Sequence, residues 1–171
     1  MQDIEGQPLH SRDLAPDFTL RATPEHTVTL SEFQGRPVVL AFYPVDWGPI
    51  CQEEMTQFDA ALCAIEQYGG VLLGISVDSV WSHQEFATRL NLRFPLLADF
   101  EPKGEVARAD GVYRAEEGTS ERALFVIDAD GALRWRYVSP PGTSPGIQGV
   151  LSTLEWLPHS IDSADRPRMH G

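Results

Sequence analysis

The chain has 171 residues, 42% of them hydrophobic, and a formal net charge of −12 at pH 7. This length supports one domain with a sizeable core, and the acidic balance argues against nucleic acid or an anionic membrane as a partner. No apolar run is long enough to cross a bilayer, and the acidic, polar residues 1–6 do not resemble a secretory signal. Two cysteines are too few for a disulfide scaffold or a four-thiolate zinc site, so the expected compartment is the reducing cytoplasm.

The first half of the chain begins with polar residues and then alternates apolar segments with turn signals. Residues 27–30 alternate in polarity, which is expected of the second arm of an N-terminal β-hairpin, and residues 31–35 predict one helical turn. Residues 37–43 are apolar on both faces, as a central strand covered on both sides should be. A loop and a long helix follow, and the helix carries one core-facing stripe formed by Met55, Phe58, Leu62 and Ile65.

The second half predicts further strands and helices in alternation. In order, these are a strand (71–77), a helix from about Val80 to Leu90 capped by Asp78 or Ser79, a short helix near 104–109, a strand (122–127), an alternating edge strand (133–138) and a last helix (148–157). This order predicts an α/β fold, with a central mixed β-sheet flanked by helices on both faces. We expect an N-terminal segment (1–13), one domain (14–157) and a C-terminal tail (158–171).

Cys51 is the first candidate for chemistry. It lies in the first turn of the helix that follows the strand at 37–43, just after Pro49. Free N–H groups and the positive end of the helix dipole favour the reactive thiolate at such a position. A free cysteine is also commonly a small buried hydrophobe, so position alone leaves both interpretations open.

The loop before Cys51 resembles the Pro-x-x-x-Thr/Ser-x-x-Cys active-site motif of peroxiredoxins, the alkyl hydroperoxide reductase and thiol-specific antioxidant family. Pro44 matches the motif's proline and Cys51 its peroxidatic cysteine, while Gly48 stands where the family has Thr or Ser. Further segments resemble the family in the same order: residues 15–20, 28–33, 94–99 and 121–128. The resemblance covers residues 14–157, is to the one-cysteine or bacterioferritin-comigratory-protein-like branch, and implies a thioredoxin-like fold.

The resemblance also implies roles and partners. Cys51 would reduce hydrogen peroxide or organic hydroperoxides and become a sulfenic acid, with Arg122 as the active-site arginine, Glu54 orienting it and Pro44 shielding the sulfur from water. Trp47 is either a further wall or a packing residue. An external thiol such as thioredoxin, glutaredoxin or a low-molecular-weight thiol would restore Cys51 without metal, haem or flavin. The resemblance further implies a bacterial protein that forms a homodimer or a higher homo-oligomer.

Gly48 leaves the rate of the reaction open, because glycine has no hydroxyl to hold the peroxide. Loss of one transition-state donor commonly costs about 3 kcal/mol, or over a hundredfold in rate. The alternatives are therefore a slower peroxidase, one tuned to another hydroperoxide, or a catalytically weak or inactive redox sensor or binding protein. A thioredoxin-like disulfide oxidoreductase is disfavoured because the chain has no Cys-x-x-Cys pair, and no signature supports a Cys–His hydrolase that uses His83.

Two other expectations concern thiols and histidines. Glu53 and Glu54 oppose the thiolate, so Arg122 must outweigh them if the pKa of Cys51 is to fall. Cys63 lies on the same predicted helix, about 18 Å further along its axis, whereas a disulfide needs Cα atoms within about 7 Å. We therefore expect Cys63 to be a helix-packing residue.

The five histidines show no metal-like spacing and are expected on the surface or in loops: His10, His26, His83, His159 and His170.

Overall fold

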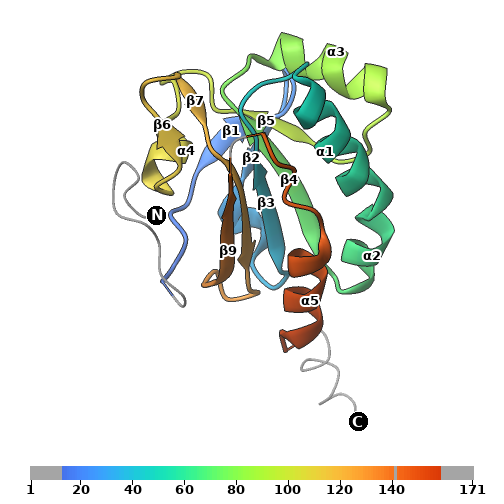
Figure 1. Cartoon of the computed structure of the whole chain (residues 1–171). Helices are drawn as coiled ribbons and strands as arrows, with labels where there is room; N and C mark the ends of the chain where they lie inside the picture. The colour runs from blue at the N-terminus through green and yellow to red at the C-terminus, as the bar shows by residue number, and fades with distance from the viewer. Residues whose placement is uncertain (1–12, 141, 159–171) are drawn as a thin grey trace.

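A seven-stranded mixed sheet runs through the computed structural model of the protein, which describes residues 13–140 and 142–158 (Figure 1). The strand order is β2-β1-β5-β4-β3-β8-β9, and a separate two-stranded ribbon pairs β6 with β7. The strands are β1 (Thr19–Arg21), β2 (Thr27–Thr29), β3 (Val38–Phe42), β4 (Val71–Ser76), β5 (Leu96–Ala98), β6 (Tyr113–Arg114), β7 (Thr119–Ser120), β8 (Arg122–Ile127) and β9 (Leu133–Ser139).

Strand β3 lies at the centre of the sheet because it is apolar on both faces and every one of its residues is buried. It pairs in parallel with β4 and antiparallel with β8. In the second pairing Phe42 lies opposite Ala123, so the end of β3 meets the beginning of β8. This register brings the loop after β3 next to Arg122, the first residue of β8.

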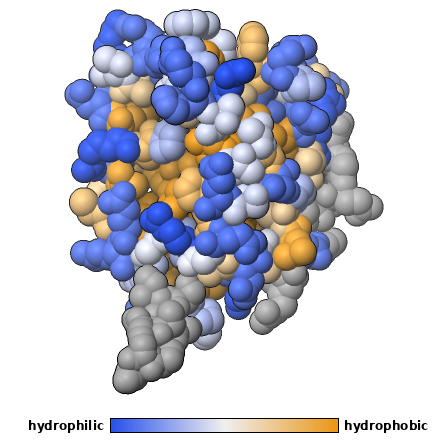
Figure 2. Space-filling view, turned by 180° about the vertical axis from the view of Figure 1, so that it is seen from behind, coloured by the Kyte–Doolittle hydropathy of each residue, from blue (hydrophilic) through white to orange (hydrophobic). Residues whose placement is uncertain are grey.

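Helices cover the sheet unequally. They are a 3-10 turn η1 (Leu30–Phe33) and the helices α1 (Pro49–Ala60), α2 (Leu62–Gln67), α3 (Val80–Leu90), α4 (Glu105–Ala109) and α5 (Gln148–Trp156). Figure 1 shows α1, α2 and α5 on one side of the sheet, and α4 with the β6–β7 ribbon on the other. Seen from behind, the molecule shows hydrophobic residues between polar side chains over the middle of that face (Figure 2).

Two hydrophobic clusters form the core, one on each face of the sheet. The first packs alternate side chains of β3 and β8, such as Leu40 and Phe125, against the N-terminal strands and the α4 region. The second packs the opposite side chains, such as Val39 and Leu124, against the helices α1, α2, α3 and α5. This second cluster includes Cys51, so the candidate thiol belongs to the packed interior.

The predicted fold is confirmed, with a mixed central sheet, helices on both faces and an N-terminal hairpin formed by β1 and β2. Helix α3 spans Val80–Leu90 as expected, and Ser79 caps it by accepting a hydrogen bond from the Ser82 N–H. The long helix after Cys51 is instead divided at Ala61 into α1 and α2. Strand β5 and the β6–β7 ribbon were not predicted, because these strands are only two or three residues long.

The predicted terminal segments lie almost wholly outside the described residues. The structure describes only residue 13 of the segment 1–13, and only residue 158 of the tail 158–171. The domain boundaries at 14 and 157 therefore stay predictions. Within the described part of the chain, no helix is both long and apolar enough to span a bilayer.

Candidate active site

The candidate site is built where β3 ends and α1 begins. Gly48 is the N-cap of α1 and Pro49 its first residue, which places Cys51 in the first helical turn as predicted. Proline suits this first position because its missing N–H would have no partner within the helix. The Cys51 side chain is turned inward and the residue is only 2% exposed.

Arg122 reaches Cys51 from the neighbouring strand. Its Nη1 donates to Cys51 Sγ at 3.1 Å and also to Glu54 Oε1 at 2.9 Å. Glu54 is fully buried and lies one helical turn after Cys51, on the same face of α1. One guanidinium nitrogen therefore joins the thiol and the carboxylate, and the structure brings Arg122 to two residues of α1 that are far from it in sequence.

Burial dominates the electrostatics of the thiol. Desolvation raises the pKa of Cys51, the Val45 N–H and the Arg122 guanidinium lower it by hydrogen bonding to the sulfur, and the charge of Glu54 raises it further. The net direction is upward, so Arg122 does not outweigh the effects that oppose the thiolate. The sequence argument weighed the charges and the helix dipole but could not weigh the loss of solvent around the sulfur.

Glu54 is also held away from water. Desolvation raises its pKa to about 7, although the Arg122 hydrogen bond and charge oppose the shift. Among the residues that the structure describes, Glu54 Oε2 and Arg122 Nε are buried without a hydrogen-bond partner. Near neutral pH the carboxyl group is therefore close to its midpoint, and the charge beside Cys51 changes in that range.

Gly48 leaves one side of the sulfur without a hydroxyl group. Its φ of −66° and ψ of 143° are accessible to any residue, so the backbone does not require glycine here. A β-carbon at this position would lie 3.6 Å from Cys51 Sγ and 3.6 Å from Val45 Cγ2, which is ordinary van der Waals contact. A side chain at position 48 would therefore point at the reactive sulfur.

Pro44 and Trp47 take different places in the loop. Pro44 lines a pocket of about 190 Å³ together with Arg122 and residues of the β6–β7 ribbon. Trp47 is 39% exposed, and its ring packs edge-on against Phe86 of α3 with centroids 5.1 Å apart. The described contacts of Trp47 therefore favour the packing interpretation, whereas Pro44 lies at a pocket that adjoins the site.

Two expectations about other residues are corrected. Cys63 is exposed instead of packed, and it lies on α2, beyond the break at Ala61. His83 is buried instead of lying on the surface, and its two ring nitrogens lie 2.8 Å from Asp46 Oδ2 and 3.1 Å from the Leu97 carbonyl. These contacts occupy the ring and leave no nitrogen free to act as the base of a Cys–His pair.

Apart from His83, the structure describes one further histidine. His26 is exposed, as expected, and His10, His159 and His170 lie outside the described residues. The residue that sequence reasoning missed is Asp46, which is 4% exposed within the loop and contacts His83. An acidic residue in a short loop before a helix usually remains solvated, so no signal in the sequence marks it as buried.

The comparisons with known proteins agree on one family. Residues 12–136 match the AhpC/TSA family. The chain belongs to this family. It is 39% identical over 129 residues to alkyl hydroperoxide reductase E of Mycobacterium tuberculosis, with 75% of this chain and 84% of that protein covered. It is also 30% identical over 154 residues to a peroxiredoxin of Thermoplasma volcanium, with 86% of this chain and 74% of that protein covered.

Solved structures of AhpC/TSA proteins share the fold. The structure of peroxidoxin BcpB from Mycobacterium tuberculosis superposes with a TM-score of 0.80 at 29% identity, covering 88% of this chain and 99% of that one. AhpC of Enterococcus faecalis gives a TM-score of 0.79 at 21% identity, which shows the fold alone. By family this AhpC/TSA protein is therefore a peroxiredoxin, and peroxiredoxins are thiol-dependent peroxidases.

Proposed function

We propose that the protein reduces hydrogen peroxide or organic hydroperoxides through Cys51, with Arg122, Glu54 and Pro44 forming the rest of the site. The observation that carries this proposal is the contact of 3.1 Å between Arg122 Nη1 and Cys51 Sγ, two residues that are both buried. An always-charged donor beside the sulfur can hold the thiolate and can hydrogen-bond an incoming peroxide oxygen.

In the reaction the Cys51 thiolate attacks one peroxide oxygen while the O–O bond breaks. The sulfur gains that oxygen and becomes a sulfenic acid, and the other oxygen leaves as water or an alcohol after it takes up a proton. Negative charge moves from the sulfur to the leaving oxygen during this step, so a guanidinium that hydrogen-bonds the peroxide stabilises the transition state more than the ground state. Because the pKa of Cys51 is raised, this stabilisation must carry most of the rate.

The sulfenic acid is returned to the thiol by outside thiols. The first thiol attacks the Cys51 sulfur and releases water, which leaves a mixed disulfide, and a second thiol displaces the first and restores Cys51. We propose thioredoxin, glutaredoxin or a low-molecular-weight thiol as the source. Cys63 is not required in this cycle, because it lies on the next helix and its side chain faces solvent.

The proposed setting is the bacterial cytoplasm, and the proposed assembly is a homodimer or a higher homo-oligomer. The aromatic rings of Trp81 and Phe100 support this assembly, because they are 67% and 51% exposed and line one groove of the surface. A second copy of the chain would remove both rings from water. Light scattering of the wild-type protein and of Trp81→Glu tests this, and a wild-type monomer at micromolar concentration contradicts it.

The peroxidase proposal is tested by adding one equivalent of hydrogen peroxide to the reduced protein and following thiol loss and intact mass. We expect the mass to rise by one oxygen, much faster than a free thiol reacts, with Cys63→Ser unchanged and Cys51→Ser inert. Oxidation no faster than that of a free thiol contradicts the proposal for hydrogen peroxide. The same assay with an organic hydroperoxide then distinguishes a different substrate from a redox sensor or binding protein without peroxidase activity.

A further inference from the structure

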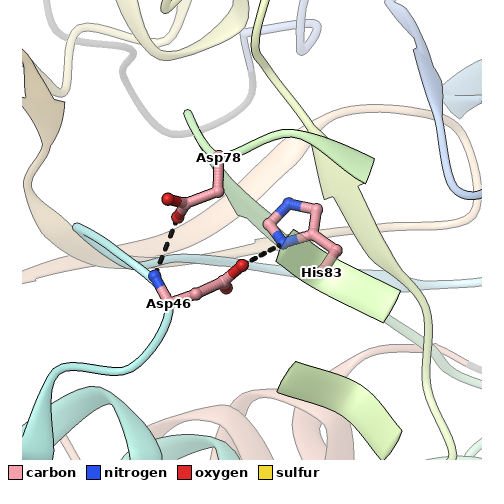
Figure 3. A group of neighbouring side chains, drawn as sticks. All are labelled: Asp46, Asp78 and His83. Atoms are coloured by element: carbon pink, nitrogen blue, oxygen red, sulfur yellow. Dashed lines mark hydrogen bonds and ion pairs between the residues drawn. The ribbon is translucent and has the colours of Figure 1, made fainter. Parts of the chain in front are cut away.

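A buried polar cluster lies behind the loop that carries the active site. Asp46 from this loop, Asp78 from the bend after β4 and His83 from α3 lie side by side (Figure 3). Asp46 Oδ1 accepts a hydrogen bond from the Tyr43 hydroxyl at 2.7 Å. Asp46 Oδ2 lies 2.7 Å from the Ser82 hydroxyl, which donates to it, and 2.8 Å from His83 Nδ1.

The backbone of residue 46 is held as firmly as its side chain. The Asp46 N–H donates to Asp78 Oδ2 at 2.8 Å, and the Ser76 hydroxyl donates to the same oxygen at 2.6 Å. Both carboxylate oxygens of Asp46 and this oxygen of Asp78 are thus engaged with hydrogen-bond donors. Although the three side chains could in principle ligate a cation, their contacts are those of a satisfied hydrogen-bond network.

His83 closes the network with both of its ring nitrogens. Nε2 lies 3.1 Å from the Leu97 carbonyl oxygen, which can only accept, and Nδ1 lies 2.8 Å from an Asp46 carboxylate oxygen. The carbonyl contact requires a hydrogen on Nε2. These contacts join the loop to α3, with Asp78 and Tyr43 as the other titratable neighbours of His83.

Asp46 lies between Val45 and Trp47 in the loop that precedes Cys51. On one side, Val45 adjoins the sulfur, because a β-carbon at Gly48 would lie 3.6 Å from both Val45 Cγ2 and Cys51 Sγ, and the Val45 backbone lowers the pKa of Cys51. On the other, Trp47 adopts a φ of 76°, a left-handed conformation that is unfavourable for a bulky residue. Such a conformation persists where the surroundings determine it, and the contacts of Asp46 and the packing of Trp47 on Phe86 do so here.

We propose that Asp46 and His83 are positioning residues, which clamp the loop between β3 and α1 so that the backbone at Val45 stays beside the Cys51 sulfur. Neither residue contacts the sulfur, and both act through the backbone of the loop. The inference deepens the proposed peroxidase function, since it concerns how the same site is held. Its structural part does not require that Cys51 reacts with peroxide.

The test measures the pKa of Cys51 by thiolate absorbance in a Cys63→Ser background, where Cys51 is the only thiol. Asp46→Asn keeps the shape of the side chain but removes its charge and one acceptor. We expect this variant to raise the pKa of Cys51 by about 1 and to slow peroxide oxidation at neutral pH by about tenfold. Glu85→Gln is the matched control, because Glu85 is an exposed carboxylate of α3 that pairs with Arg89 outside the network.

Ser82→Ala serves where Asp46→Asn does not fold, because it removes one donor and leaves Asp46 paired with His83. A smaller rise in the pKa of Cys51 is expected from it. A purely structural role would lower the melting temperature of the variants but leave the pKa of Cys51 unchanged, and that result overturns the proposal. If the wild type does not react with peroxide, the proposed function fails, while the titration still decides the positioning role.

Discussion

A side chain placed at Gly48 would point at the sulfur of Cys51, because the β-carbon position of residue 48 lies 3.6 Å from Cys51 Sγ. This is the position at which the peroxiredoxin motif has a hydroxyl-bearing residue. The backbone here is compatible with any residue, and the nearest atoms are at normal contact distance. The missing hydroxyl can therefore be restored with little distortion of the loop.

Gly48→Thr should speed the oxidation of Cys51 by hydrogen peroxide by about a hundredfold. The added hydroxyl supplies a donor to the peroxide oxygens in the transition state, and one such donor is commonly worth about 3 kcal/mol. Stopped-flow measurement of thiol loss checks the rate. Gly48→Val is the control, since valine matches threonine in shape without the hydroxyl. Equal rates in the two variants would show that the hydroxyl is not what this site lacks.

Arg122→Lys should slow peroxide oxidation by more than a hundredfold while the chain stays folded. Lysine keeps the charge but has a single nitrogen on a flexible stem, so it cannot maintain the contacts with both Cys51 and Glu54 in one geometry. The rate of the single-turnover reaction is the measurement. Arg134→Lys is the matched control, because Arg134 lies on the neighbouring edge strand β9 and pairs with Asp128, away from Cys51. A similar loss in both variants would point to a general destabilisation.

Glu54→Gln should lower the pKa of Cys51, because the negative charge of Glu54 raises it. The amide oxygen of glutamine can still accept from Arg122. With the pKa of Glu54 at about 7, its charge grows as the pH rises through neutrality, so the difference between variant and wild type should widen above pH 7. Alkylation of Cys51 by iodoacetamide should be several-fold faster in the variant at pH 8.

The neighbouring Glu53 provides a control for this experiment. It lies on the same helix turn but is exposed, so solvent screens its charge. Glu53→Gln should change the alkylation rate by less than twofold. If the two variants behave alike, the effect comes from net charge and not from the buried carboxylate beside the sulfur.

Asp110 should make stability fall as the pH rises. It is 1% exposed, and burial raises its pKa from 3.8 to about 8, with the charge of Asp99 adding to the shift. The folded chain therefore binds more protons than the unfolded chain between these values. The contribution of Asp110 is fully present below about pH 4 and is lost as the pH rises through about 8.

Urea unfolding from pH 4 to pH 9 measures this effect. Relative to the wild type, Asp110→Asn should gain stability steadily across this range, because asparagine cannot ionise. Asp130→Asn, at an exposed turn, should run parallel to the wild type. A constant difference between Asp110→Asn and the wild type would mean that Asp110 does not titrate on folding.

Much of the fold could be read from the order of apolar segments. Strand β8 and helix α3 have the predicted bounds, because long apolar runs and a serine cap are local signals. The division of the long helix at Ala61 was not predictable, since the apolar stripe continues across it and all its members are buried. Strand β5 is only three residues long and exists through its pairing with β4 and β1.

Part of the candidate site could likewise be predicted from local sequence, and part depends on which strands pair. The position of Cys51 in the first turn of a helix follows from Pro49 and the strand before it, which are neighbours in the chain. The family resemblance pointed to Arg122, but only the pairing of β3 with β8 brings its guanidinium to the sulfur. Local signals can place a residue on an element, whereas contacts across the sheet depend on which strands become neighbours.

The sequence by itself determined the longer strands and helices, the family motif and the departure at Gly48, because each depends on residues close together in the chain. Only the tertiary structure decided the upward pKa of Cys51, the exposure of Cys63 and the burial of Asp46 with His83. These properties depend on how much water remains around a group once distant segments have packed. Desolvation is a property of the packed interior, so a residue's neighbours in sequence do not reveal it.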